Sequence, residues 1–258
     1  MAAAPYIVTR GIVLRETETK EADKILTLLT AERGKISVIA RGVRRKGCKY
    51  AACAQPLVYS EWTLYQKGDW YYANDGATIE LFRGLQTDLE AMALGFYLAE
   101  LTEAVTTEET DADALLRHLL NGLYALAVLH KPKPLVKAAF ELRLLSLAGY
   151  EPLADSCAYC GAPEPEQPLL DVMQGVLRCR KCGTLEGGHA LPLCPDSLAA
   201  LRHAVYGDPK RLYSFTLGGE SLRRLSRAAE AFTATQLERG FKTLDFYKSL
   251  QSMEPDIS

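Results

Sequence analysis

The sequence of 258 residues lacks several features that mark common protein classes. No run approaches the eighteen or so apolar residues that a membrane-spanning helix needs. The first residues lack the charged start and the apolar stretch of a secretory signal. The net charge is only −2, so the composition as a whole does not indicate a protein that binds polyanions. We therefore expect a soluble, cytoplasmic protein with no membrane contact, whose partners must be inferred from the distribution of its charges.

Catalytic motifs are also missing. The sequence contains no G-x-x-x-x-G-K-[ST], no H-E-x-x-H, no G-x-S-x-G and no Rossmann glycine fingerprint. The signature of zinc deaminases fails as well, because Ser156 precedes Cys157 and no His-x-Glu stands before it. These absences favour a binding protein over an enzyme. A nucleic-acid-processing enzyme with an unrecognised motif is a rival interpretation.

The chain does contain cysteines at the spacing of a zinc ribbon. Two C-x2-C pairs are separated by eighteen residues, and two such turns can close a tetrahedron of thiolates around one Zn2+. Four thiolates leave no open position, so this metal would be structural. The alternative is a set of redox-active or incidental pairs. Three further cysteines, Cys48, Cys53 and Cys194, suit a reducing compartment. The predicted metal ligands are Cys157, Cys160, Cys179 and Cys182.

Basic residues are concentrated near the N-terminus. Residues 33–49 contain seven of them and no acidic residue. Cations on a loop that glycine interrupts can follow a phosphate backbone without reading its sequence. An ordinary solvated loop is the alternative for so short a run. The predicted contacts to a nucleic-acid backbone are Lys35, Arg41, Arg44, Arg45, Lys46 and Lys49.

Six aromatic residues, including both tryptophans, lie within residues 59–72. Aromatic faces beside a basic groove are typical of proteins that hold single strands. A small barrel must place about half of these rings in its core. Alternation separates Trp62 from Tyr59 and Tyr65, so we expect Trp62 in the core.

The order of the elements predicts an α+β protein. Residues 1–82 read as short strands, which suit an OB-fold β-barrel, although an SH3-like barrel would give a similar pattern. Residues 83–152 and 191–258 form an α-helical domain, whose last helix is expected to run from about residue 220 to 250. Residues 153–190 form the zinc ribbon inserted into this domain.

Several segments resemble the bacterial RecO family of recombination mediators. They are GIVLR (11–15), EADKIL (21–26), IARGVRR (39–45), FYLAEL (96–101), FELRLL (140–145), GYEP (149–152), CAYCG (157–161) and GFKTL (240–244). They span nearly the whole chain in order. The resemblance implies an N-terminal OB-fold, a helical C-terminal domain and, in many members, a four-cysteine zinc site.

The resemblance also implies a function. A member binds single- and double-stranded DNA, anneals complementary strands and, with RecR, helps RecA to replace single-strand binding protein. RecA and RecF would be indirect partners, the chain would be associated with the nucleoid, and it would hydrolyse no nucleotide. The alternative from the residues alone is a zinc-ribbon adaptor that binds only proteins.

Overall fold

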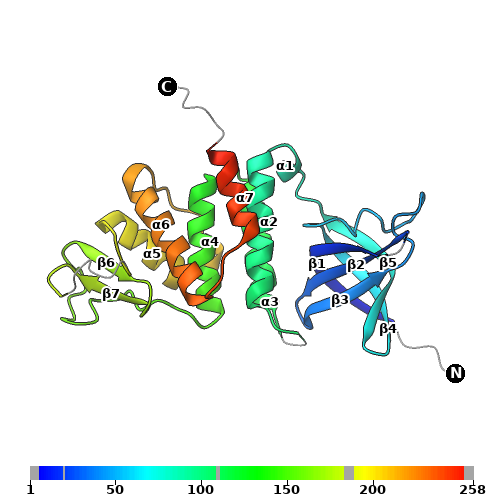
Figure 1. Cartoon of the computed structure of the whole chain (residues 1–258), viewed down its shortest axis with the longest axis horizontal. Helices are drawn as coiled ribbons and strands as arrows, with labels where there is room; N and C mark the ends of the chain where they lie inside the picture. Colours follow the sequence, from blue (N-terminus) through cyan, green and yellow to red (C-terminus); the bar gives the residue numbers. More distant parts are fainter. Residues whose placement is uncertain (1–5, 20, 109–110, 183–188, 253–258) are drawn as a thin grey trace. The chain divides into compact units, whose positions relative to one another are not determined.

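The computed structural model describes residues 6–19, 21–108, 111–182 and 189–252 of the chain (Figure 1). The chain forms two compact units, Met1–Val128 with Thr243–Ser258, and Leu129–Lys242. Among the described residues, no helix has the length and apolar character needed to cross a membrane.

The first unit begins with a closed five-stranded barrel, which confirms the predicted OB-like fold. Strand order around the barrel is β1-β2-β3-β5-β4. The β3–β5 pairing is parallel and the other four are antiparallel. The strands are β1 (Ile7–Thr19), β2 (Asp23–Thr30), β3 (Gly34–Ala40), β4 (Tyr59–Lys67) and β5 (Trp70–Glu80).

Alternating residues of these strands fill the barrel. Leu26, Val38 and Trp62 have no exposed surface, which confirms that Trp62 is a core residue. Tyr50, from the connection before β4, packs edge-on against Trp62 with ring centroids 6.4 Å apart. The space beside the indole is narrow, because a Cβ added at Gly76 would lie 3.2 Å from Sγ of Cys53 and 3.4 Å from the indole ring.

Four helices complete the first unit: α1 (Arg83–Gln86), α2 (Leu89–Val105), α3 (Asp113–Ala127) and α7 (Lys242–Gln251). Asp88 caps α2 by accepting a hydrogen bond from the N–H of Ala91 at 2.9 Å. Helix α2 forms hydrogen bonds to α7 and to strand β3 of the barrel. Its Glu100 accepts a hydrogen bond from Thr243 on α7 at 2.5 Å, and the backbone carbonyl of its Glu103 accepts one from Lys35 on β3 at 3.3 Å.

The second unit contains α4 (Lys133–Leu147), α5 (Pro195–Tyr206) and α6 (Gly219–Gln236), with a short 3-10 turn, η1 (Pro209–Arg211). α4 packs against both α5 and α6. The core of this unit contains an ion cluster. The ammonium group of Lys137 is buried and lies 2.9 Å from the carboxylate of Glu141 and 2.9 Å from that of Glu230. Desolvated charges of this kind persist only when they are paired.

The prediction of one helix over residues 220–250 is wrong. The helix ends at Gln236, and α7 begins at Lys242. Glu238 has a φ of 50°, in the left-handed region that ends a helix, and Gly240 follows it. The apolar spacing continues across the break, so periodicity alone hid it.

The second unit also holds a small antiparallel sheet in the order β7-β6-β8. Its strands are β6 (Pro168–Asp171), β7 (Val176–Cys179) and β8 (Ala190–Pro192). Leu153 forms a parallel bridge to Val176, so the chain before the first cysteine pair also joins this sheet. Residues 183–188 of the predicted ribbon lie outside the described residues.

Candidate nucleic-acid interface and metal centre

The loop after β3 presents most of the predicted DNA contacts on one exposed segment, residues 41–49, which we call the basic segment. Gly42 and Gly47 have φ values of 63° and 84°, which other residues rarely adopt. The N–H of Gly42 donates to Asp23 at 2.7 Å, and the hydroxyl of Tyr50 donates to the carbonyl of Arg41 at 2.8 Å. The loop backbone is therefore fixed while its cationic side chains extend outward.

The cations of this segment differ in their contacts. The guanidinium of Arg41 lies 4.7 Å from the ring centroid of Tyr72, and that of Arg44 lies 3.0 Å from Glu18. Arg45, Lys46 and Lys49 are exposed, and no described residue forms an ion pair with them. Four of the five cations in the segment thus have no carboxylate partner among the described residues.

Lys35, the remaining predicted contact, lies apart from the basic segment. It lies at the start of β3, six residues before Arg41, or about 20 Å away at about 3.3 Å per residue. Its ammonium group donates to the carbonyl of Glu103 on α2. The structure brings together the predicted contacts from Arg41 to Lys49 and leaves Lys35 beside α2.

The aromatic residues of β4 and β5 divide between core and surface. Trp62 and Tyr71 are buried, Tyr59, Tyr65 and Tyr72 are half-buried, and Trp70 is exposed. The division follows the alternation of the strands, which places neighbouring residues on opposite faces.

The four predicted metal ligands come together in one cluster. All four Sγ atoms lie within 4.8 Å of one another. Cys160 and Cys179 are 3.8 Å apart, which matches the edge of about 3.8 Å that a tetrahedron with Zn–S bonds of about 2.3 Å requires. The cluster can therefore hold a metal ion.

Backbone hydrogen bonds build this cluster. The N–H of Ala158 donates to Leu177 of β7 at 2.8 Å, which attaches the first cysteine turn to the sheet. Gly161, with a φ of 72°, closes that turn, and its N–H donates to the carbonyl of Cys157 at 2.9 Å. Cys179 is the last residue of β7. The sheet thus fixes both halves of the metal centre.

Hydrogen bonds around the sulfur atoms shift the pKa values of two of the cysteines in opposite directions. Burial favours the neutral thiol of Cys157, but the backbone N–H groups of Cys160, Tyr159 and Cys179 outweigh it and lower its pKa to about 6. Hydrogen bonds with the other thiols raise the pKa of Cys182 to about 12. A bound metal ion would displace the shared protons.

Two of the three basic residues near the second pair are engaged in local contacts. Arg178 forms an ion pair with Asp171 and lies 5.1 Å from the ring centroid of Tyr159. Lys181 lies 2.7 Å from Glu166. These two cations therefore stabilise the ribbon rather than extend the basic segment.

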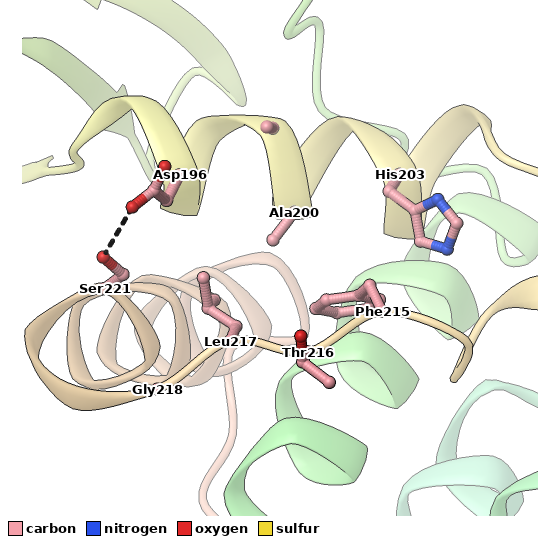
Figure 2. Close-up of a pocket in the computed structure, with 9 residues that line it drawn as sticks. Asp196, Ala200, His203, Phe215, Thr216, Leu217, Gly218 and Ser221 are labelled. Atoms are coloured by element: carbon pink, nitrogen blue, oxygen red, sulfur yellow. Dashed lines mark hydrogen bonds between the residues drawn. The ribbon is translucent and has the colours of Figure 1, made fainter.

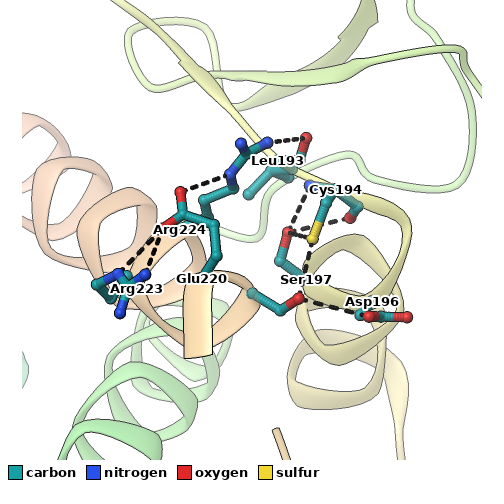
Figure 3. A network of polar contacts seen from close by, with 8 residues as sticks. Leu193, Cys194, Asp196, Ser197, Glu220, Arg223 and Arg224 are labelled. Atoms are coloured by element: carbon teal, nitrogen blue, oxygen red, sulfur yellow. Dashed lines mark hydrogen bonds and ion pairs between the residues drawn. The ribbon is translucent and has the colours of Figure 1, made fainter. Parts of the chain in front are cut away.

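Sequence reasoning assigned no role to Cys194, and the structure shows that it caps α5 (Figure 3). Its N–H donates to the hydroxyl of Ser197 at 2.7 Å, and its Sγ lies 3.3 Å from the hydroxyls of Ser197 and Ser221. Burial opposes the ionised thiol, but these hydroxyl contacts lower the pKa of Cys194. A cysteine at an N-cap position gives no sequence signal, because serine, threonine, aspartate and asparagine usually stand there.

A groove of about 430 Å3 lies between α5 and the extended segment that precedes α6 (Figure 2). Its ionisable side chains already have partners. Asp196 accepts a hydrogen bond from Ser221 at 3.4 Å, and Nε2 of His203 lies 3.0 Å from the carbonyl of Arg211. The ring of His203 also packs against Phe215, with centroids 5.1 Å apart. We assign no chemistry to this groove.

The chain matches two family models. The model described as Recombination protein O N terminal matches residues 1–82, and Recombination protein O C terminal matches residues 86–245. A DNA repair protein RecO from Acetivibrio thermocellus is 32% identical over 249 residues, covering 96% of this chain and 99% of the relative. One from Symbiobacterium thermophilum is 34% identical over 247 residues, covering 94% and 96%.

Proposed function

The chain belongs to the recombination protein O family of DNA repair and recombination proteins, and we propose that it binds DNA and anneals complementary single strands. With RecR, it assists RecA in replacing single-strand binding protein on single-stranded DNA; RecF takes part indirectly. It works on the nucleoid in the cytoplasm and catalyses no reaction of its own.

The observation that carries this proposal is the exposed basic segment. Arg41, Arg45, Lys46 and Lys49 have no carboxylate partner among the described residues, and Arg44 has one that is itself exposed. Each cation that neutralises a phosphate releases a condensed counterion, which favours binding without regard to sequence. Annealing follows because such contacts reduce the repulsion between two strands and leave their bases free to pair.

The four-cysteine cluster supports Zn2+ as the bound metal. Cys157, Cys160, Cys179 and Cys182 would hold it, and four thiolates suit zinc better than the hard cations that prefer oxygen. The ion supplies structural cross-linking of the two cysteine turns, with no open position for a substrate. The ribbon then offers a rigid surface to partner proteins.

A second candidate function is a protein-binding adaptor. The observation that favours it is a group of exposed apolar side chains near the metal centre, in which Leu153, Tyr159 and Met173 are 62%, 56% and 56% exposed. Such side chains mark contact sites for proteins when they gather in one patch. An adaptor of this kind would not shift an oligonucleotide in a gel, which separates the two candidates.

The test of the proposed function is strand annealing on oligonucleotides coated with single-strand binding protein. We compare the wild type with Arg44→Glu/Arg45→Glu, which reverses two charges of the basic segment. The matched control is Lys210→Glu/Arg211→Glu, which makes the same change at an exposed site in the second unit. We expect the first variant to anneal about tenfold more slowly and the control to match the wild type. Equal rates for all three proteins would refute the role of the basic segment.

A salt titration supplies an independent measure. If about five cations contact phosphates, the slope of log affinity against log salt concentration on single strands should be near −3.5, since each contact contributes about −0.7. Binding that does not change between about 50 and 200 mM salt would contradict the electrostatic mechanism.

A further inference from the structure

Three tyrosines form a continuous row on the outer face of the barrel. The rings of Tyr65 on β4 and Tyr72 on β5 are stacked, with centroids 5.2 Å apart and planes at 13°. Tyr6, just before β1, packs edge-on against Tyr65, with centroids 6.5 Å apart and planes at 89°. Strand register explains the row, because Tyr65 pairs with Tyr72 and Leu64 pairs with Ile7.

Arg41 ends this row. Parallel pairing places Ile39 of β3 beside Tyr72, and Arg41 follows two residues later. Its guanidinium lies 4.7 Å from the ring centroid of Tyr72, an arrangement that favours a cation over an aromatic face. An aromatic ring, rather than a carboxylate, thus fixes Arg41, so its charge remains available to an anion. We call Tyr6, Tyr65, Tyr72 and Arg41 the aromatic column.

The same face carries a second cation and an exposed indole. Trp70 pairs with Lys67 at the hairpin between β4 and β5. Because side chains alternate along a strand, Trp70 lies on the face of Tyr72, and Lys67 lies on the face of Tyr65. Lys67 is exposed, and no described residue forms an ion pair with it. The face therefore combines exposed rings with two cations that have no acidic partner among the described residues.

The dimensions of the column suit a nucleic-acid strand. The column spans four neighbouring strands of the barrel in the order β1, β4, β5 and β3, with Tyr6 just before β1 and Arg41 just after β3. At about 4.8 Å between strands its three intervals extend about 14 Å, which is close to the four steps of about 3.4 Å that separate five stacked bases.

Exposed rings need an explanation, because their burial in an apolar contact is favourable. Tyr6 is 62% exposed and Trp70 is 44% exposed, so each has a free ring surface. Aromatic rings beside cations are the arrangement by which proteins hold unpaired bases. The bases of a duplex are stacked on one another and offer no free face.

We propose that this outer face is a stacking subsite for the unpaired bases of single-stranded nucleic acid. Tyr6 and Trp70 stack on bases, Arg41 and Lys67 contact the adjacent phosphates, and Tyr65 and Tyr72 position Arg41. The subsite rests on the proposed function, because it takes a DNA strand as its ligand. It adds a preference for single strands over duplex, which the basic segment alone does not provide.

Tryptophan fluorescence tests the subsite directly, because the chain has two tryptophans and Trp62 is fully buried. Titration with oligothymidylate should quench the emission of Trp70, and a duplex should quench it much less. Trp70→Phe should abolish the change while the buried indole still emits. Tyr6→Ala and Trp70→Ala should each weaken binding of the single strand at least about fivefold, the effect of one lost base stack. The matched control, Tyr124→Ala, removes a 46% exposed tyrosine from α3 and should bind as the wild type does.

The outcomes separate the two proposals. If the wild type binds no oligonucleotide, the proposed function itself fails. If the wild type binds but its emission is constant, and Tyr6→Ala and Trp70→Ala bind equally well, the subsite is refuted while the proposed function survives. Loss of RecR binding by these variants with unchanged DNA affinity would also overturn the subsite and assign the face to a protein. Circular dichroism melting confirms that each variant is folded, and both substituted side chains are exposed.

Discussion

The guanidinium of Arg44 lies 3.0 Å from the carboxylate of Glu18, and both side chains are exposed. Counting partners among the described residues, Arg44 is the cation of the basic segment whose charge is partly neutralised in the free protein. A phosphate that binds Arg44 must compete with Glu18. Exposed pairs of this kind contribute only about 0–1 kcal/mol, so the competition is weak but measurable.

We expect Glu18→Gln to increase the affinity for single-stranded DNA about two- to fivefold, because it releases Arg44 and removes a repulsive charge. Fluorescence anisotropy with a labelled oligonucleotide at low salt measures the change. Glu32→Gln is the matched control, since it removes an exposed carboxylate of the same barrel outside the basic segment. Weaker binding by Glu18→Gln would show that the Arg44–Glu18 pair orders the loop for DNA instead of competing with it.

Substitution of one cysteine of the cluster should abolish zinc binding. We expect the wild type to contain about one equivalent of Zn2+ per chain, and Cys157→Ser to contain none, because three thiolates and a hydroxyl hold zinc poorly. A chelator dye that detects zinc released on denaturation provides the measurement. Cys194→Ser should retain the metal, since Cys194 caps α5 instead of joining the cluster. Zinc loss from both variants would place Cys194 among the ligands and contradict the assignment.

The buried Lys137 should be sensitive to substitution. Its side chain is 3% exposed and lies between Glu141, which is fully buried, and Glu230. Lys137→Met leaves the Glu141 charge buried without its cation and should destabilise the second unit by about 3–5 kcal/mol in denaturant unfolding. The double variant Lys137→Met/Glu141→Leu should recover most of this loss, because it removes both charges. A double variant as unstable as the single one would show that the cost arises from packing.

The pH dependence of this cluster has a definite sign. Burial lowers the pKa of Lys137, but Glu141 and Glu230 outweigh it and hold the pKa above its ordinary value of 10.5. A pKa that is higher in the folded state than in the unfolded state stabilises the fold fully below the unfolded value. The Tm of the wild type relative to that of Lys137→Met/Glu141→Leu, which removes both buried charges, should thus stay constant from about pH 8 to about pH 10 and fall above it. A difference that grows with rising pH would contradict the raised pKa.

Much of the fold was predictable because its signals are local. The alternation of apolar residues predicted the barrel strands and the burial of Trp62, and the spacing of the cysteines predicted the four-cysteine cluster. The end of α6 and the contact of Lys35 were not predictable. The end of α6 depends on the left-handed Glu238 before Gly240, which an uninterrupted apolar spacing conceals. The engagement of Lys35 with Glu103 needs the packing of a helix on the barrel.

Gly84 provides a final test of the packing in the first unit. A Cβ added there would lie 1.9 Å from the backbone carbonyl oxygen of Ala127. A carbonyl cannot move as a flexible side chain would, so α1 and the end of α3 must separate. We expect Gly84→Ala to destabilise the first unit by about 1–3 kcal/mol or more and to lower its Tm. Gly240→Ala is the matched control, because no heavy atom lies within 4 Å of the added Cβ, and we expect a change within about 0.5 kcal/mol. If both variants melt with the wild type, the close approach of α1 to Ala127 is absent in solution.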